Sequence, residues 1–571
     1  MRKLLRIDLT NKKYRYEDMP AAYASLGGRG LTSKIVSEEV PPTADALGKE
    51  NKLIFAAGIL AGTVVPCSSR LSVGAKSPLT NGIKEANAGG TAGQKLGRLG
   101  IQGIVVEGIS GEFVLAKVTR DGVNFIPAGR LKGAGNHETI STIKHDHGDK
   151  VAIISIGPAG EDILRAAAVS VTSLDFKPRM AARGGLGAVM GSKRLKAVII
   201  DDTGADGVQV SDAVKLKEAA AGLSKGVLAH PFIRGLREFG TANLVNVTNG
   251  LGCMPTKNFS MGRFEAAEKI SGETIVATMA KRPNSSAAHG CMAGCIIGCS
   301  NIYTDEQGEE IVSSLEYETI ALVGSNCMVS DLDDIALINR LCNDLGLDTI
   351  DVGAALGVAM EAGLLPWGDG KAAYALIEEA RTGTEKGCMI AHGCAYTGKK
   401  LNVKRVPHVK GQALAGYDPR VLKGTGVTYA TSPMGADHTN GVAMPTPAYP
   451  EYDPTASTGH NQLSAFLQVH TAAIDCLGIC LFVGIPTRTI PEMQKYLVDC
   501  IIAVTGQAPH ENYLRNLGIS VLKWERKFNE AAGLTSSDDR LPEFFEKEPL
   551  PPSGLVFDVP EADIDSVLNF S

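Results

Sequence analysis

The stretch His289–Asn301, "HGCMAGCIIGCSN", groups side chains that bind metals. Cys291, Cys295 and Cys299 stand there with three residues in each gap. Three thiols are too many for one disulfide and one fewer than the four ligands of a zinc or iron–sulfur centre. Buried thiols without a metal and a zinc site are the alternatives, although zinc more often uses paired two-cysteine knuckles. The pattern favours an iron–sulfur cluster with a distant fourth ligand.

The fourth ligand is one of the other cysteines. The chain has 12 cysteines, and in a reducing compartment these serve as metal ligands or buried thiols before disulfides. The spacing alone does not choose among them. The candidates are Cys67, Cys253, Cys327, Cys342, Cys388, Cys394, Cys476, Cys480 and Cys500.

The composition is that of an ordinary globular protein of several domains. The 571 residues are 44% hydrophobic and 21% charged, and the net charge of -5 argues against a nucleic-acid binder with a basic face. The apolar runs are shorter than the roughly 18–20 residues that span a bilayer. The N-terminus, "MRKLLRIDLTNKKYRYEDMP", alternates like a strand and lacks the apolar core of a signal peptide. We expect a cytoplasmic protein without a membrane segment.

The elements that position the cysteines change type along the chain. Residues 1–203 contain short β-type runs such as "KLIFAAG", "GIVVEG" and "VAIISIG", punctuated by glycine turns. Beyond them, apolar residues recur three and four apart, which is typical of amphipathic helices. The basic stretch "GKKLNVKRVPHVKGQ" suggests another boundary. The sequence predicts an α+β protein: a β-rich domain 1–203 and mainly helical domains 204–405 and 406–571.

Several motifs in order resemble the tungsten-containing aldehyde ferredoxin oxidoreductase family. They include "LGGRGL", "PCSSRLSVGAKSPLTNGIKEANAGG", "ARGGLGAVMGSKRLKAV", "EYETIALVGSN", "LCNDLGLDTID", "GYDPR" and "DCLGIC", and together they run over nearly the whole chain. The resemblance implies an N-terminal β-domain whose two sheets cradle a bis-pyranopterin tungsten cofactor. Two helical domains would close over it. Molybdenum in place of tungsten is the alternative.

The resemblance also implies a complete ligand set for a [4Fe–4S] cluster. Its members would be Cys291, Cys295 and Cys299 with Cys480 of "DCLGIC". The even three-residue gaps differ from the two-then-three gaps of the best-known family members. We therefore expect the loop at Gly294 to be one residue longer than theirs.

Other positions match the family's cofactor contacts. Arg70 would lie between cluster and pterin, and Mg²⁺ would bridge the pterin phosphates through the carbonyls of Asn87 and Gly184. Asn343 stands where the family more often has an aspartate, which removes one negative charge. The full set of expected pterin contacts is Arg70, Asn87, Gly89, Arg183, Gly184, Gly185, Asn343, Gly346, Leu347, Asp348, Asp475, Gly478 and Ile479.

Two further matches supply acid–base chemistry. Glu318 of "EYETI" matches the family's general base, and His438 of "MGADHTNG" matches a histidine that hydrogen-bonds the metal-bound oxygen or the substrate carbonyl. Without the resemblance, a surface glutamate and a loop histidine would be the simpler interpretation. Glu316 is the weaker candidate for the base. Leu337 occupies the position where some members have a glutamate that binds an iron between subunits, so we expect no such iron.

Three functions are compatible with these residues. The first is oxidation of aldehydes to carboxylic acids, with electrons passed to ferredoxin or an iron–sulfur subunit. The second is the active-site subunit of an aromatic acyl-CoA reductase of the benzoyl-CoA type on the same scaffold. The third is a non-enzymatic electron carrier, which would leave the glycine-rich pterin motifs without a purpose. The oligomeric state stays open, a homo-oligomer included.

Overall fold

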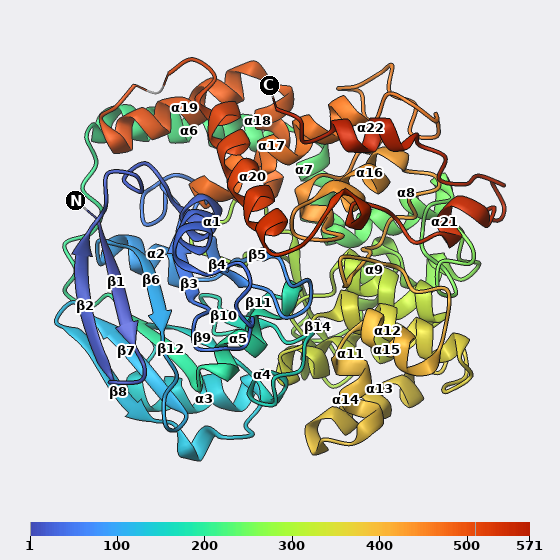
Figure 1. Ribbon diagram of the computed structural model, residues 1–571, viewed down its shortest axis with the longest axis horizontal. Helices are drawn as coiled ribbons and strands as arrows, with labels where there is room; N and C mark the ends of the chain where they lie inside the picture. The colour runs from blue at the N-terminus through green and yellow to red at the C-terminus, as the bar shows by residue number, and fades with distance from the viewer. Residues whose placement is uncertain (1, 509, 571) are drawn as a thin grey trace.

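The computed structural model describes residues 2–508 and 510–570 (Figure 1). Within these ranges the N-terminal part contains two six-stranded sheets. The first sheet has the order β2-β1-β6-β3-β4-β5, in which β1 and β6 run parallel and the other neighbours antiparallel. Its strands are β1 (Lys3–Asp8), β2 (Lys13–Asp18), β3 (Leu53–Ala57), β4 (Leu71–Lys76), β5 (Ile83–Ala88) and β6 (Ile101–Glu107).

The second sheet has the order β11-β10-β9-β12-β7-β8, with β12 and β7 parallel. Its strands are β7 (Val114–Thr119), β8 (Gly122–Pro127), β9 (Val151–Ser155), β10 (Val169–Thr172), β11 (Pro178–Ala181) and β12 (Leu195–Asp201). The helices among these strands are α1 (Gly28–Glu39), α2 (Ala92–Arg98), α3 (Asn136–His147), α4 (Pro158–Glu161) and α5 (Leu186–Ser192).

The two sheets share a core, which explains their uninterrupted apolar strands. Phe55 and Ile104 of the first sheet belong to the same buried cluster as Ile154 and Val198 of the second. Strands buried on both faces read as continuous runs of β-branched and aliphatic residues, as in "LIFAA" and "VAIIS". The expected β-rich N-terminal part is confirmed.

The rest of the chain is mainly helical, which confirms the α+β class. In Figure 1 most of the green and yellow helices lie to the right of the sheets, and the orange and red helices lie in the upper part of the molecule, above the sheets on the left and above green helices on the right. These helices are α6 (Ala213–Ala229), α7 (Pro231–Phe239), α8 (Leu244–Leu251), α9 (Gly272–Met279), α10 (Tyr317–Thr319), α11 (Leu332–Leu345), α12 (Thr349–Glu361), α13 (Gly370–Glu378), α14 (Glu385–Ala391), α15 (Cys394–Leu401), α16 (Lys423–Thr431), α17 (Asn461–Leu477), α18 (Leu481–Thr489), α19 (Pro491–Thr505), α20 (Tyr513–Ala531), α21 (Phe544–Lys547) and α22 (Glu561–Ser566).

Contacts between distant helices join the parts of the chain. α1 packs against α17 and α20, and α6 packs against α19, so the segment from α17 onward contacts both earlier regions. Short strands also interrupt the helical region: β13 (Ser286–His289), β14 (Ser300–Thr304) and β15 (Glu310–Val312) form one small sheet. β16 (His408–Val409) pairs with β17 (Gln412–Ala413). Among the helices described, none combines the length and apolarity that crossing a bilayer requires.

Candidate active site

The three clustered cysteines lie in the loop that joins β13 to β14. Gly294 and Gly298 turn this loop at φ values of 68° and 66°, conformations that suit glycine. Hydrogen bonds from the neighbouring thiols of Cys291 and Cys67, and then from backbone amides, lower the pKa of Cys295. A lowered pKa favours the thiolate, which is the form that binds metals. Among the loop thiols this shift is confined to Cys295, because the hydrogen bond with Cys295 and burial raise the pKa of Cys291, and burial raises the pKa of Cys299.

Cys480 reaches the same place from the C-terminal part of the chain. It is the N-cap residue of α18, just after α17 ends at Gly478 with φ 71°. Burial raises the pKa of both Cys299 and Cys480. The charge of Cys480 adds to the shift of Cys299, and the charge of Cys295 adds to the shift of Cys480, so the three sulfurs lie near one another. The structure thus brings together the four cysteines that the resemblance selects.

Cys67 is a fifth thiol in this group. Its backbone N–H donates to the Gly294 carbonyl at 3.0 Å, and its own carbonyl accepts from the Cys480 N–H at 2.9 Å. Its sulfur accepts from the Ile296 N–H at 3.3 Å. Cys67 was one of the candidates for the fourth ligand. Its position in "PCSSR", three residues before Arg70, was the sequence signal that it lies here.

Hydrogen bonds connect Arg70, three residues after Cys67, with other expected pterin contacts. The Arg70 N–H donates to the Gly478 carbonyl at 3.1 Å, and the Arg70 guanidinium donates to the Asn87 carbonyl at 2.9 Å. Asn87 then donates from its side-chain amide to Asp475 at 3.2 Å. Gly89 lies against the loop, because a Cβ there would be 2.7 Å from the Cys291 sulfur. Arg70, Asn87, Gly89, Asp475 and Gly478 therefore form one continuous group.

Asp475 is embedded in a buried charge network. Burial raises the pKa of Asp475 to about 6, and the Arg29 guanidinium, with its Nη1 3.4 Å from the carboxylate, opposes this shift. Arg29 also pairs with Glu525 at 2.8 Å. Nearby, burial raises the pKa of Glu85 to about 7. The motif "LGGRGL" was matched to the family without a role for its arginine, Arg29. A charged residue between glycines in a cofactor motif was the signal that could have identified it.

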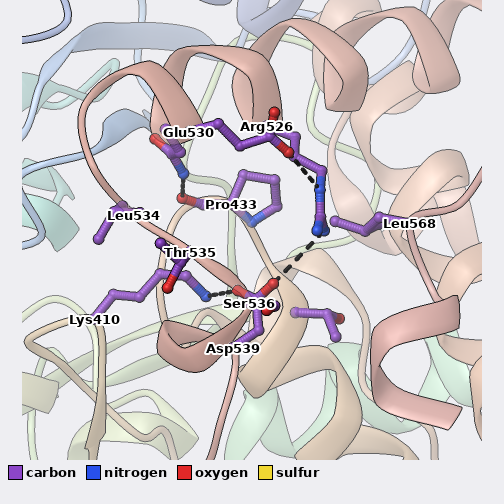
Figure 2. Close-up of a pocket in the computed structure, with 11 residues that line it drawn as sticks. Lys410, Pro433, Arg526, Glu530, Leu534, Thr535, Ser536, Asp539 and Leu568 are labelled. Carbon is purple, nitrogen blue, oxygen red and sulfur yellow. Dashed lines mark hydrogen bonds and ion pairs between the residues drawn. The ribbon is translucent and has the colours of Figure 1, made fainter. Parts of the chain in front are cut away.

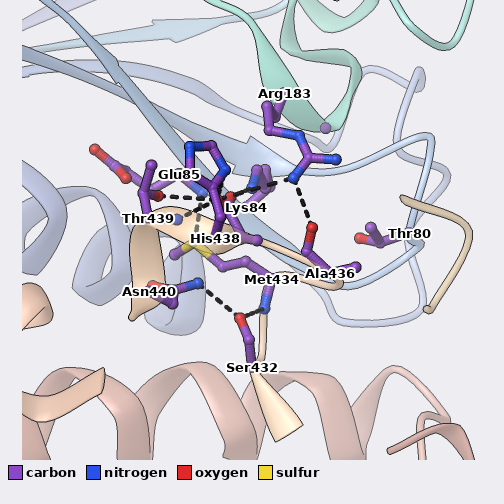
Figure 3. Close-up of polar contacts among 12 residues, drawn as sticks. Thr80, Lys84, Glu85, Arg183, Ser432, Met434, Ala436, His438, Thr439 and Asn440 are labelled. Atoms are coloured by element: carbon purple, nitrogen blue, oxygen red, sulfur yellow. Dashed lines mark hydrogen bonds and ion pairs between the residues drawn. The ribbon is translucent and has the colours of Figure 1, made fainter. Parts of the chain in front are cut away.

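Arg183, Gly184 and Gly185 form the turn before α5. Both glycines have positive φ, 82° and 72°, and a Cβ at Gly184 would be 2.4 Å from the Lys84 side chain. Figure 3 shows Arg183 donating to the Ala436 carbonyl, at 2.6 Å. Lys84 forms a buried ion pair with Asp437 at 2.6 Å. The turn is thereby fixed against the loop that carries His438.

The segment Asn343–Asp348 joins α11 to α12. Gly346 ends α11 in the left-handed conformation at φ 74°, and Asp348 caps α12 by accepting from the Ile350 N–H at 2.9 Å. Leu347 pairs with Ala167 in an isolated bridge. The Arg183 Nε lies 3.4 Å from the Asp348 carboxylate. These contacts place the expected second pterin segment beside the Arg183 turn.

Glu318 and His438 face each other. Glu318 lies on α10, which continues into a π-helical turn at 320–324, a feature often found at functional sites. Glu318 Oε2 accepts from the Gly416 N–H at 2.7 Å, and Glu318 Oε1 is 3.5 Å from His438 Nε2. Glu318 Oε1 and His438 Nδ1 have no hydrogen-bond partner among the described residues.

Glu316, the weaker candidate for the base, is occupied. Its carboxylate accepts from the Thr241 hydroxyl at 2.5 Å and also from the Ser314 hydroxyl. Tyr317 and Tyr417 are buried beside Glu318, with 5.3 Å between their ring centroids. The carboxylate of Glu318 is therefore the one with a free oxygen.

Family models match both parts of this structure. The model of the N-terminal domain of aldehyde ferredoxin oxidoreductase matches residues 4–202, and the model of domains 2 and 3 matches residues 218–569. The chain belongs to the aldehyde ferredoxin oxidoreductase family. The second match begins within α6, after the last strand of the two large sheets.

Similar proteins extend over nearly the full length. The tungsten-containing aldehyde ferredoxin oxidoreductases of Pyrococcus furiosus and Thermococcus kodakarensis are each 34% identical, over 96% of this chain and 92% of theirs. An aliphatic sulfonate oxidoreductase subunit of Pyrococcus furiosus, described as WOR-like, is 28% identical over 96% of this chain and 90% of its own.

A solved structure shares the fold. The active-site complex BamBC of benzoyl coenzyme A reductase, bound to 1,5-dienoyl-CoA, superposes with a TM-score of 0.78 at 20% identity. The match covers 95% of this chain and 91% of that chain. At this identity the likeness shows the fold alone.

The residues present fit the cofactors that the family implies. Besides Glu318 and His438, the Glu85 Oε1, the Tyr429 hydroxyl and the Gln412 amide are buried without a partner in the described chain. Such atoms are rare in proteins unless a ligand or water satisfies them. No three His, Cys, Asp or Glu side chains in residues 2–508 and 510–570 converge on a single ion. A four-iron cluster does not need such convergence, because four thiolates ligate a multinuclear centre.

Two cavities lie away from these residues. The first, shown in Figure 2, has a volume of about 50 Å³. Its lining includes Asp539, which forms ion pairs with Lys410 at 2.5 Å and with Arg526 at 3.6 Å. The other, about 340 Å³, is lined in part by Cys388 and His392. Neither is lined by a residue that the family resemblance assigns to the site.

Proposed function

We propose that this protein is a tungstopterin and [4Fe–4S] oxidoreductase that oxidises aldehydes to carboxylic acids and passes the electrons to ferredoxin. One observation carries the proposal. Hydrogen bonds of Arg70, three residues after Cys67, reach Gly478 just before Cys480 and continue through Asn87 to Asp475, so the segments of two cysteines also carry the expected pterin residues. The 34% sequence identity with tungsten-containing aldehyde ferredoxin oxidoreductases, over 96% of the chain, supports the same assignment.

Two groups of residues would hold the bis-pyranopterin. One is the Arg70, Asn87 and Asp475 path with Gly89, Gly478 and Ile479. The other is the turn Arg183–Gly185 with the segment Asn343–Asp348. Mg²⁺ would use the carbonyls of Asn87 and Gly184, which accept hydrogen bonds from the Arg70 guanidinium and the Ser77 hydroxyl.

When bound, tungsten supplies the two-electron redox chemistry, and the cluster divides the pair into single electrons. The protein supplies the proton chemistry. Glu318 Oε2 is fixed by the Gly416 N–H, so Oε1 is the free oxygen that accepts a proton. His438 lies 3.5 Å away, too far for a strong direct hydrogen bond to Glu318, and its ring N–H can be donated to a substrate oxygen.

The electron exit lies on the cysteine side. Gly294 is exposed at the tip of the cysteine loop, and Cys295 is half-buried beside it. Arg237, an exposed residue on α7, donates to the Ile296 carbonyl at 3.3 Å. A ferredoxin, or an iron–sulfur subunit, would approach this loop because electron transfer requires close approach to the cluster.

Metal analysis of the purified protein under anoxia tests the assignment. One tungsten and about four irons per chain are expected, with molybdenum as the alternative metal. Zinc alone would exclude the proposal. A panel of aldehydes with a viologen dye then tests the reaction. If no aldehyde reduces the dye while an aromatic acyl-CoA turns over with partner subunits, the fold shared with the benzoyl-CoA reductase complex extends to its chemistry and the aldehyde assignment is wrong.

Other features of the protein remain part of the proposal. These are the division at 1–203, 204–405 and 406–571, a cytoplasmic location and an oligomeric state that includes a homo-oligomer. Leu337 lies on α11 with 41% of its surface exposed. Because leucine cannot ligate iron, we propose that no iron bridges subunits at this position. Size-exclusion chromatography with light scattering, together with iron counts, measures both.

A further inference from the structure

Arg179, on β11, differs from the other buried arginines in its charge balance. Four of them, Arg6, Arg29, Arg183 and Arg420, each have a carboxylate within 3.4 Å of the guanidinium. Arg179 is equally buried, with 9% of its surface exposed, but it forms no ion pair with any residue that the structure describes. A buried charge without a partner is strongly destabilising, so this arginine requires a negative group that the protein around it does not supply.

Two serines hold the Arg179 guanidinium in place. Its Nη1 donates to the Ser300 hydroxyl at 3.3 Å, and its Nη2 donates to the Ser313 hydroxyl at 3.0 Å. Its Nε is buried and has no hydrogen-bond partner within residues 2–508 and 510–570. Neutral hydroxyls orient the guanidinium without cancelling its charge. Because Ser300 directly follows Cys299, the first of these bonds places the charge beside the cysteine loop.

Strand pairing places the same side chain near a second expected ligand. Arg179 is the register partner of Val171 on β10, so the two side chains lie on one face of the sheet. The Val171 side chain abuts Gly90, where a Cβ would be only 2.7 Å from it. The preceding residue, Gly89, abuts the Cys291 sulfur in the same way. The guanidinium thus lies where the first and third cysteines of the loop meet the sheet.

We propose that Arg179 is the buried counter-charge of the [4Fe–4S] cluster. The inference rests on the proposed function. Four thiolate ligands give such a cluster a net negative charge that increases on reduction, so a fixed positive charge nearby stabilises the reduced form more than the oxidised form. Arg179 thereby raises the reduction potential of the cluster and makes it a better electron acceptor. Arginine suits this role because its charge is permanent.

The test compares the cluster potentials of the wild-type protein, Arg179→Met and Arg179→Lys in redox titrations monitored by electron paramagnetic resonance. Methionine removes the charge, whereas lysine keeps the charge without the guanidinium fork. We expect about four irons per chain in all three proteins. The potential of Arg179→Met should be more negative than that of the wild type, and the potential of Arg179→Lys should lie close to it. Because the charge is buried, the shift should persist at an ionic strength of about 1 M.

Arg120→Met is the matched control. Arg120 is exposed in the turn between β7 and β8, at the opposite edge of the same sheet from β11. Its replacement removes the same formal charge and should leave the potential unchanged. An unchanged potential in Arg179→Met would overturn the inference. Equal shifts in Arg179→Met and Arg179→Lys would overturn it as well, because the effect would not follow the charge.

Iron content decides the case in which a variant does not retain its cluster. Loss of iron in Arg179→Met but not in Arg179→Lys would support the inference, because retention of the cluster would then follow the positive charge. Loss of iron in both variants would assign Arg179 a role in the fold and overturn the inference. A wild-type protein without a four-iron signal would instead reject the proposed function, on which the inference depends.

Discussion

Two regions of this protein are built in opposite ways. The cysteine edge, Cys67, Cys291, Cys295, Cys299 and Cys480, is made of loops and turns, with Gly294 exposed at its tip. The acid–base pocket, Glu318, His438, Tyr317 and Tyr417, rests on a helix and on tightly packed aromatic rings. Tyr317 and Tyr417 are 1% and 4% exposed.

The difference matches the demands of the two kinds of chemistry. A cluster helps to organise its own ligands, so thiols on loops suffice, and electrons leave best from a site near the surface. A proton acceptor must be held in place before the reaction, in surroundings that exclude water. Glu318 meets this demand because the Gly416 N–H fixes one carboxylate oxygen and leaves the other free. The comparison predicts that damage to one region leaves the other intact.

The largest effect is expected from Cys480→Ala. Losing one of four ligands should reduce the cluster to three irons or fewer and abolish dye reduction, while tungsten content stays the same. Iron analysis and electron paramagnetic resonance measure the loss. Cys476→Ala, in the same "DCLGIC" motif, should keep four irons. Four irons in Cys480→Ala would show that the ligand set is wrong.

Glu318→Gln attacks the other region. An amide cannot accept the proton, so turnover should fall by roughly 10²–10⁴-fold while iron and tungsten contents do not change. Steady-state rates with the best aldehyde measure this. Glu316→Gln is the control, because Ser314 and Thr241 already bind that carboxylate. Comparable losses in both variants would remove the distinction between the two glutamates.

Gly89→Ala tests the contact between the expected pterin residue Gly89 and the cysteine loop. The new Cβ would lie 2.7 Å from the Cys291 sulfur, so the loop must shift. We expect cluster affinity to fall roughly tenfold, as for other changes next to a metal ligand, measured as faster iron release to a chelator. Gly111→Ala serves as control, since a Cβ there meets no atom within 4 Å. Equal release rates would show that Gly89 does not limit the loop.

An effect on stability alone, outside both regions, is a pH dependence at Glu85. Burial raises the pKa of this carboxyl to about 7, so between its ordinary value and pH 7 the folded state binds more protons than the unfolded state. Stability therefore falls as pH rises through this window. Glu85→Gln should stabilise the protein at pH 8 relative to pH 5, by on the order of 3 kcal/mol.

Thermal unfolding at the two pH values measures this change. The exposed Glu265→Gln is the control, and it should give the same small change at both. A pH-independent effect of Glu85→Gln would mean that Glu85 is ionised in the folded protein throughout the range. Neither variant touches the cysteine edge, so iron content should not change.

Residue types and local spacing predicted much of this protein. Runs such as "LIFAA" predicted buried strands because burial on both faces demands continuous apolar residues. The helical periodicity beyond residue 203 predicted the helices. The helix end at Gly346 and the helix start at Asp348 are local features as well, since a left-handed glycine and a capping carboxylate act within one turn of chain.

Longer-range features were not readable from the pattern itself. The strands β13 and β14 on either side of the cysteine loop lie in a region whose periodicity indicates helix, because short strands are stabilised by pairing rather than by their own sequence. The free oxygen of Glu318 depends on the N–H of Gly416, 98 residues away. The family resemblance selected Glu318 and His438, but it did not give the physical reason that distinguishes Glu318 from Glu316.

By itself, the sequence determined that three thiols share one loop, that the N-terminal part is β-rich and that the charged and glycine motifs follow the family order. Only the tertiary structure decided that Cys67 joins Cys480 at that loop, and that Arg29 meets Asp475 across 446 residues. The physical reason is range. Backbone preferences and periodicity act over a few residues, whereas a site assembled across three segments exists only when packing brings those segments together.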